Sequence, residues 1–73
     1  MVLIFKSRDS ARLADYLKDH PKATLYNVIA TAYFLEYKLL DRNEVQAVVD
    51  RHHATGYIPS YLSSYLARVQ VAN

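Results

Sequence analysis

The three histidines, at positions 20, 52 and 53, are the residues of this chain best suited to bind a metal ion or to carry a proton. A zinc or catalytic site needs three or four converging ligands, and the chain has neither a cysteine nor a His-x-x-x-His pair. Neighbouring residues of a helix point about 100° apart, so His52 and His53 cannot face one ion together. The sequence therefore predicts no metal site and no cofactor, with His52 at the edge of the core and His53 in solvent.

Glu36 is the other candidate for acid–base chemistry, because it stands within the most apolar stretch of the chain, Thr24–Leu40. A carboxylate in such a place needs a cation, a histidine or a tyrosine hydroxyl beside it. Catalysis would also need a second perturbed group in a cleft, and no nucleophile motif, glycine-rich phosphate loop or acidic pair supplies one. We therefore expect a protein that is not an enzyme and has no catalytic residues, in which Glu36 forms a structural pair.

The stretch Thr24–Leu40 has the pattern of the central helix of a small domain, with Thr24 as its cap. At about 100° per residue, its aliphatic side chains form one stripe and its tyrosines form a second stripe beside it. A helix that is apolar around most of its circumference needs neighbours on several sides, and this one is too short and too polar to span a bilayer. The first stripe comprises Leu25, Val28, Ala32, Leu35 and Leu39, and the second comprises Tyr26, Ala30, Tyr33 and Tyr37.

Before this helix, the pattern predicts one helix and one extended segment. Residues 9–20 have helical periodicity, and Pro21 ends them because the residue before a proline is disfavoured in the helical conformation. The run Val2–Phe5 is apolar and partly β-branched, so we expect a short extended or β segment there.

After the central helix, the pattern predicts two more helices. Asp41 caps the first of them, with Glu44 three residues on as in a capping box. Gly56 ends that helix, because the left-handed conformation costs glycine nothing. Pro59 and Ser60 begin the last helix, with Ser60 as its cap.

Length and composition bound the fold to a single, mainly α, four-helix domain over residues 1–73. A hydrophobic fraction of 52% and a single glycine favour a compact helical chain over a disordered one. The lack of cysteine and of a secretory leader leads us to expect a cytoplasmic protein. A formal net charge of +2 is compatible with nucleic acid but weaker than a dedicated nucleic-acid binder requires.

The C-terminal half, Asp41–Val69, resembles a helix-turn-helix unit. Its string GYIPSYLSSYL is similar to the turn and recognition helix of the arabinose-operon regulator family. The stripe of Tyr61, Ser64 and Arg68 would be the exposed face, but Arg68 is the only cation of that helix, which is poor provision for phosphate contacts. A DNA-binding repressor or excision-type factor is therefore an alternative function, and a helical pair that only closes the core explains the same pattern.

Over its whole length, from MVLIFKSRDSARLADYL to SYLARVQVAN, the chain resembles the very small transcription regulators made by lytic phages of Xanthomonas. The resemblance implies a protein that binds the host RNA polymerase, suppresses initiation by interfering with the sigma factor and prevents termination. It also implies action in the cytoplasm of the infected bacterium and no enzymatic activity. An inhibitor of some unrelated host machine is also compatible with the composition.

The surface chemistry favours a protein partner. The chain has seven tyrosines, which suit half-buried surfaces and interfaces. Its N-terminal cations alternate with carboxylates, a mixture that matches a protein better than a polyanion. The residues predicted to bind the partner are Lys6, Arg8, Arg12, Tyr57, Tyr61, Ser64 and Arg68.

Overall fold

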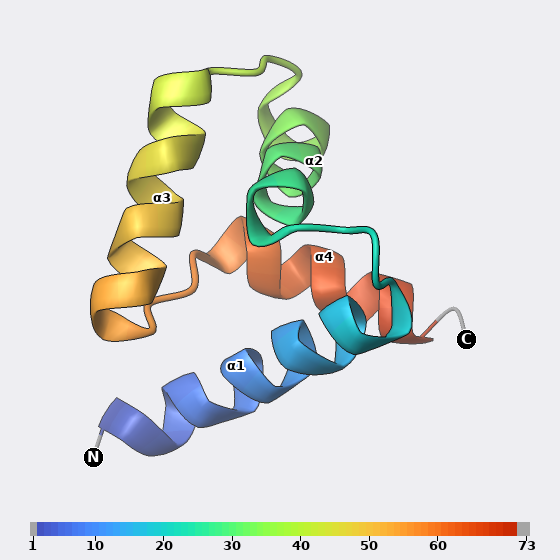
Figure 1. The fold of residues 1–73 in the computed structure, drawn as a ribbon, viewed down its shortest axis with the longest axis vertical. Helices are drawn as coiled ribbons and strands as arrows, with labels where there is room; N and C mark the ends of the chain where they lie inside the picture. The colour runs from blue at the N-terminus through green and yellow to red at the C-terminus, as the bar shows by residue number, and fades with distance from the viewer. Residues whose placement is uncertain (1, 72–73) are drawn as a thin grey trace.

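The computed structural model describes the backbone of residues 2–71 and the side chains of residues 9–69. Four helices make up this part of the chain, and no strand occurs in it, so the predicted mainly α, four-helix architecture is confirmed (Figure 1). The helices are α1 (Val2–Asp19), α2 (Leu25–Tyr37), α3 (Arg42–Thr55) and α4 (Ser60–Val71).

Helix α1 begins earlier than the sequence indicates. The extended or β segment predicted for Val2–Phe5 is instead part of this helix. A lone strand would leave backbone donors and acceptors unpaired, whereas a longer helix pairs them within the segment. The end of α1 is as predicted: the His20 amide still donates to the Tyr16 carbonyl at 3.0 Å, and Pro21 follows.

Helix α2 has the predicted cap but ends three residues before Leu40. The Thr24 hydroxyl accepts a hydrogen bond from the Asn27 amide at 3.1 Å, which satisfies one free donor of the first turn. At the other end, Lys38 adopts the left-handed conformation (φ 59°) and its amide donates to the Phe34 carbonyl at 2.7 Å. The chain leaves the helical path at Lys38 and turns into α3.

Helix α3 begins and ends where the sequence predicts, and α4 differs in its cap. Asp41 accepts from the amides of Asn43 and Glu44 at 3.0 and 3.2 Å, and Gly56 (φ 76°) ends α3. In α4 the amides of Leu62 and Ser63 both donate to the Pro59 carbonyl, each at 3.1 Å. Pro59 therefore holds the cap position, and Ser60 is the first helical residue rather than the cap.

The core lies where α2 meets the other helices. In Figure 1, α2 and α3 form an antiparallel pair, and α4 lies between this pair and α1. Two polar bonds join α1 to α4: the Ser63 hydroxyl donates to the buried Asp9 carboxylate at 3.1 Å, and the hydroxyls of Tyr16 and Tyr65 lie 3.4 Å apart. The buried apolar side chains are Leu13, Val28, Ile29, Ala32, Val45, Val49, Leu62 and Leu66.

The aliphatic stripe predicted for the central helix is only partly the buried one. Val28 and Ala32 are buried, but Leu35 and Leu39 are 45% and 61% exposed. Ile29, which belongs to neither predicted stripe, is fully buried. The neighbouring helices bury Val28, Ile29 and Ala32 of α2 and cover its last turn only in part.

Candidate partner-binding surface

A continuous part of the chain, from the last turn of α2 into the loop before α3, exposes five large apolar side chains. Their exposed fractions lie between 42% and 61%, whereas the core side chains of the same helix are at most 3% exposed. Exposed apolar side chains that gather in one place mark interaction sites, whereas single ones need no explanation. This exposed apolar segment comprises Phe34, Leu35, Tyr37, Leu39 and Leu40.

Local backbone geometry keeps the segment exposed. Because Lys38 ends the helix in the left-handed conformation, Leu39 and Leu40 fall in the connection to α3 and not on a helix face that could pack inward. Asp41 then fixes the start of α3 by accepting two backbone hydrogen bonds. Both ends of this short connection are thus held, which limits the conformations that its leucines can reach.

A cluster of three tyrosines joins the exposed segment, to which Tyr37 belongs, to α4. The ring of Tyr37 lies 4.7 Å from that of Tyr33 and 5.6 Å from that of Tyr61, and Tyr33 and Tyr61 are 5.7 Å apart. The contacts of Tyr61 are edge-to-face, the arrangement that the charge distribution of aromatic rings favours. The cluster ties the exposed end of α2 to α4.

The Tyr61 hydroxyl of this cluster is buried and has no hydrogen-bond partner within residues 9–69. Burial raises the pKa of Tyr61 to about 12, and the nearby groups Tyr37, Tyr33, Glu44 and Tyr57 add to the rise. Tyr33 has a raised pKa for the same main reason, with Glu44 and Asp41 contributing. Both shifts favour the neutral hydroxyls of Tyr33 and Tyr61, so these two side chains support the surface by packing rather than by charge.

Next to the exposed segment, a groove of about 420 Å³ runs between the end of α2 and the last turns of α4. Its apolar lining comes from Leu35, Tyr65 and Val69, and its two charged side chains are Lys38 and Arg68. Tyr65 is held by its contact with the Tyr16 hydroxyl, and this hydrogen bond, together with burial, raises the pKa of Tyr65 to about 12. We call this the basic groove.

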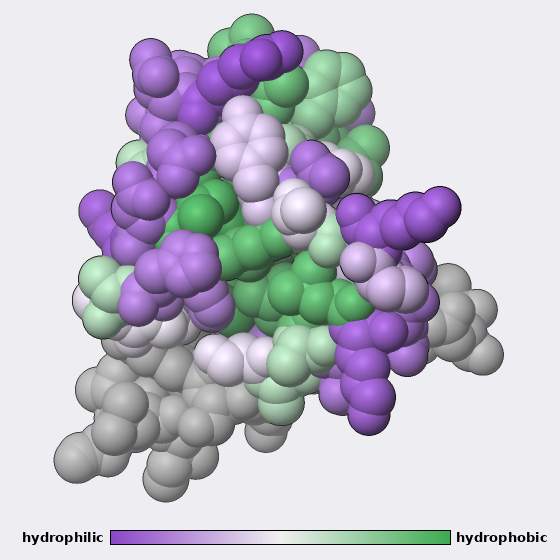
Figure 2. Space-filling view, in the orientation of Figure 1, coloured by the Kyte–Doolittle hydropathy of each residue, from purple (hydrophilic) through white to green (hydrophobic). Residues whose placement is uncertain are grey.

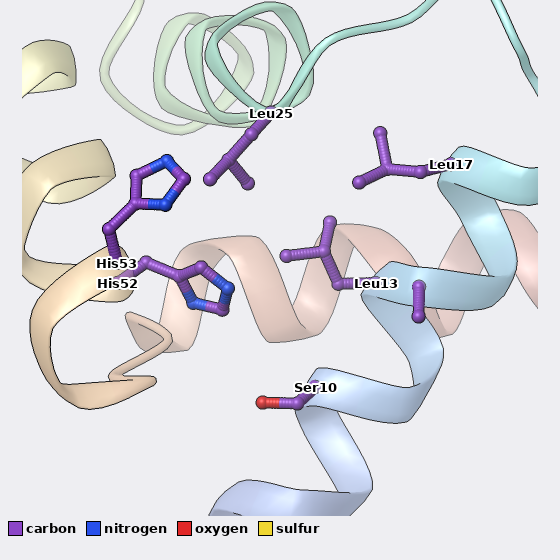
Figure 3. A pocket seen from close by; sticks show the side chains of 7 residues that line it. Ser10, Leu13, Leu17, Leu25, His52 and His53 are labelled. Carbon is purple, nitrogen blue, oxygen red and sulfur yellow. The ribbon is translucent and has the colours of Figure 1, made fainter.

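A second apolar hollow lies on the opposite side of the core from α4. Figure 2 shows it as a hydrophobic patch surrounded by hydrophilic side chains, and Figure 3 shows that both imidazoles of α3 point toward it. His52 is half-buried and His53 is exposed, as predicted. The hollow has a volume of about 410 Å³ and is lined by Ser10, Leu13, Ala14, Leu17, Leu25, His52 and His53.

The third histidine lies outside this hollow. The His20 ring stacks on Tyr16 at 4.1 Å, and its Nδ1 is 2.9 Å from the Tyr16 carbonyl oxygen. Among the residues that the structure describes, no group of three or more histidine and acidic side chains comes close enough to hold a metal ion. Glu36 is exposed, so its carboxylate does not stand in the apolar setting from which a structural pair was predicted.

Three of the predicted partner-binding residues, Tyr57, Ser64 and Arg68, line two different grooves of the described part of the chain. Tyr57 and Ser64 are exposed and line a groove of about 340 Å³ with Asp9, whereas Arg68 lines the basic groove. Tyr57 also lies under the Arg51 guanidinium, 5.4 Å from the ring centre. Ser64 and Arg68 are exposed on α4 as predicted.

Tyr61 and the N-terminal cations are not seen as exposed side chains, unlike Tyr57, Ser64 and Arg68. Tyr61 is half-buried in the tyrosine cluster, so the prediction that it shares an exposed face with Ser64 and Arg68 is wrong. Arg12 is half-buried on α1. The side chains of Lys6 and Arg8 lie outside the part of the chain whose side chains the structure describes.

Sequence reasoning missed the exposed apolar segment because it assigned Leu35 and Leu39 to the core. A signal for it was present. A helix that is apolar around most of its circumference has more apolar surface than a few short neighbours can cover, and the run LEYKLL continues that apolarity to the very end.

Comparison of the chain with protein-family models, curated proteins and solved structures gives no match. Within residues 2–71, none of the helices combines the length and the apolarity needed to cross a bilayer.

Proposed function

We propose that this chain is a non-enzymatic regulator that binds bacterial host RNA polymerase, suppresses initiation by interfering with the sigma factor and prevents termination. Two lines support the proposal. The sequence resembles small lytic-phage transcription regulators over its whole length. The exposed apolar segment, from Phe34 to Leu40, is the observation that carries the protein-binding part.

A protein partner suits this segment better than other ligands do. Covering large apolar side chains removes their surface from water, at about 25 cal/mol per Å² of apolar area. Tyrosine and arginine are favoured at the energetically important positions of interfaces, and Tyr37 and Arg68 lie at or beside the segment. The tyrosine cluster that joins it to α4 holds the surface in one arrangement, which lowers the entropic cost of binding.

The direct test is capture of purified host RNA polymerase, as core enzyme and as holoenzyme, by the immobilised full chain. We expect wild type to retain polymerase and to reduce promoter-dependent initiation and terminator-dependent release in purified transcription reactions. Leu39→Ser should lose capture, and Lys22→Ser, an exposed change in the α1–α2 turn, should keep it. Failure of wild type to retain either form of polymerase would refute the function.

A second candidate, a DNA-binding helix-turn-helix protein, is favoured by one observation. Only four residues, Gly56 to Pro59, separate α3 from α4, a length that matches the turn of such units. Its weakness is charge, because Arg68 is the only cation among the α4 side chains of residues 60–69. This candidate predicts that the chain shifts duplex DNA at low salt and that Arg68→Ala weakens the shift. Absence of any shift at low salt would exclude it.

A further inference from the structure

The basic groove combines an apolar lining with two cations, and its wall contains no acidic side chain among residues 9–69. Leu35, Tyr65 and Val69 supply the apolar part. Within residues 9–69, the side chains of Lys38 and Arg68 make no ion pair and no hydrogen bond. Both side chains are exposed, so they are available to an incoming group.

We propose that this groove binds an acidic amphipathic helix of the partner protein. An apolar side chain of that helix packs on Leu35 and Val69, and carboxylates on either side of it pair with Lys38 and Arg68. This inference rests on the proposed protein-binding function and names the kind of segment that the partner supplies. Helices that dock in grooves present apolar residues at i, i+3 or i+4 and i+7, and Leu35, Tyr65 and Val69 are the apolar side chains of the groove that such a series would contact.

The same features argue against a nucleic-acid strand as the occupant. Phosphate recognition relies on several cations that follow the backbone, and the groove offers two. A phosphate placed against the apolar lining would lose hydration without gaining a hydrogen bond there, whereas the apolar face of an amphipathic helix matches that lining. Glu36, exposed one residue after Leu35, adds a negative charge that a polyanion would have to avoid.

Three synthetic helical peptides provide the probe, each about 18 residues long so that a helix can form. They share a leucine stripe at i, i+3, i+4 and i+7 and differ only in the flanking positions, which are glutamate, serine or lysine. Binding of each fluorescent peptide to the full chain is measured by anisotropy. We expect the glutamate peptide to bind wild type about tenfold more tightly than the lysine peptide, because each of two rim pairs contributes a modest amount.

Charge reversal separates recognition from general attraction. The double variant Lys38→Glu/Arg68→Glu should invert the order, so that the lysine peptide binds best. The control Lys22→Glu/Arg42→Glu changes the net charge equally at two exposed residues outside the groove and should keep the wild-type order. Leu35→Ser should weaken all three peptides. If a reversed variant loses its far-ultraviolet helical signal, Lys38→Gln/Arg68→Gln replaces it and should abolish the preference.

Several results would overturn the inference. Equal binding of the three peptides, an order that charge reversal leaves unchanged, or displacement of the glutamate peptide by duplex DNA would each do so. The proposed function is judged separately by polymerase capture. If the glutamate peptide is preferred but polymerase is not captured, the groove still binds an acidic helix and polymerase is rejected as the partner. If Lys38→Glu/Arg68→Glu and Leu35→Ser both still capture polymerase, polymerase remains the partner and the groove is rejected as its binding site.

Discussion

At the scale of single residues, the buried Tyr61 hydroxyl is a polar group that lowers the stability of the fold. Its ring contributes packing to the cluster with Tyr33 and Tyr37, but its oxygen is buried with no partner within residues 9–69. A buried polar group without a hydrogen bond costs free energy that a carbon–hydrogen group would not. The ring and the hydroxyl therefore act in opposite directions on stability.

Tyr61→Phe should raise the free energy of unfolding by about 1 kcal/mol, because it keeps the ring and removes the unsatisfied hydroxyl. Urea denaturation followed by circular dichroism measures the change. The matched control is Tyr65→Phe, which removes the hydroxyl contact with Tyr16 and should be neutral or destabilising. A loss of stability in Tyr61→Phe as large as that in Tyr65→Phe would contradict the assignment.

The raised pKa values of Tyr61 and Tyr65, each about 12, predict a loss of stability in alkali. Below pH 10, the ordinary pKa of tyrosine, both hydroxyls keep their protons in the folded and unfolded states and stability is at its full value. Between pH 10 and about 12 the unfolded chain releases these protons first, so the folded state loses stability as pH rises.

Thermal unfolding measured from pH 9 to pH 12 should therefore show a falling midpoint, and Tyr61→Phe should fall less than wild type. A midpoint that stays constant across this range, or an equal fall in both proteins, would show that these hydroxyls do not have raised pKa values.

At the scale of elements, two left-handed residues set where the helices stop. Lys38 ends α2 with φ 59°, and Gly56 ends α3 with φ 76°. Glycine adopts this conformation without a steric cost, whereas lysine does not. The α2 end is thus the more strained of the two, and it is the end that places Lys38 in the basic groove and frees Leu39 and Leu40 from the helix.

Gly56→Ala should lower the free energy of unfolding by about 1 kcal/mol, because an alanine in the left-handed conformation meets its own backbone. No atom beyond the local chain lies within 4 Å of the added Cβ, so packing contributes nothing to the expected change. Chemical denaturation gives the value, and Ala54→Gly, an exposed change within the same last turn, separates this cost from helix propensity. No change in Gly56→Ala would mean that the turn adopts another conformation in solution.

At the scale of the whole molecule, α2 has two roles at its two ends. Its first turns supply Val28, Ile29 and Ala32 to the core, between α3 and α4. Its last turn contacts α4 through Tyr37, yet this turn and the following loop leave large apolar side chains 42% to 61% exposed. We therefore expect substitutions in the exposed apolar segment to alter the surface while leaving the core contacts of α2 intact.

Ile29→Ala and Leu39→Ser should separate these roles. Ile29 is fully buried, and its truncation should cost about 2–5 kcal/mol, comparable to the roughly 3–5 kcal/mol that a single core gives a domain of this size. Leu39 is 61% exposed, so its replacement should change stability by no more than about 0.5 kcal/mol.

Thermal unfolding by circular dichroism measures both variants. An Ile29→Ala protein as stable as wild type, or a Leu39→Ser protein as unstable as Ile29→Ala, would contradict the division of α2 into a core end and a surface end.

The features that the sequence determined by itself are local ones. The caps at Thr24 and Asp41 and the stop at Gly56 depend on hydrogen bonds and backbone angles within a few residues, so residue types alone identify them. The helical class follows from periodicity in the same way. The boundary errors, at Val2–Phe5, at the end of α2 and at Ser60, fall at helix ends, which residue types define less sharply than helix interiors.

Only the tertiary structure decided which apolar residues serve the core and which serve the surface. Ile29, Leu35 and Leu39 have similar side chains in one apolar stretch, and their exposed fractions range from 0% to 61%. The packing of α3 and α4 on α2 buries Ile29 and leaves Leu35 partly uncovered, whereas Leu39 lies in the loop after the helix, and no spacing within the stretch encodes this difference. The same holds for the basic groove, because Lys38 and Arg68 are 30 positions apart in sequence and meet only through the packing of α4 on α2.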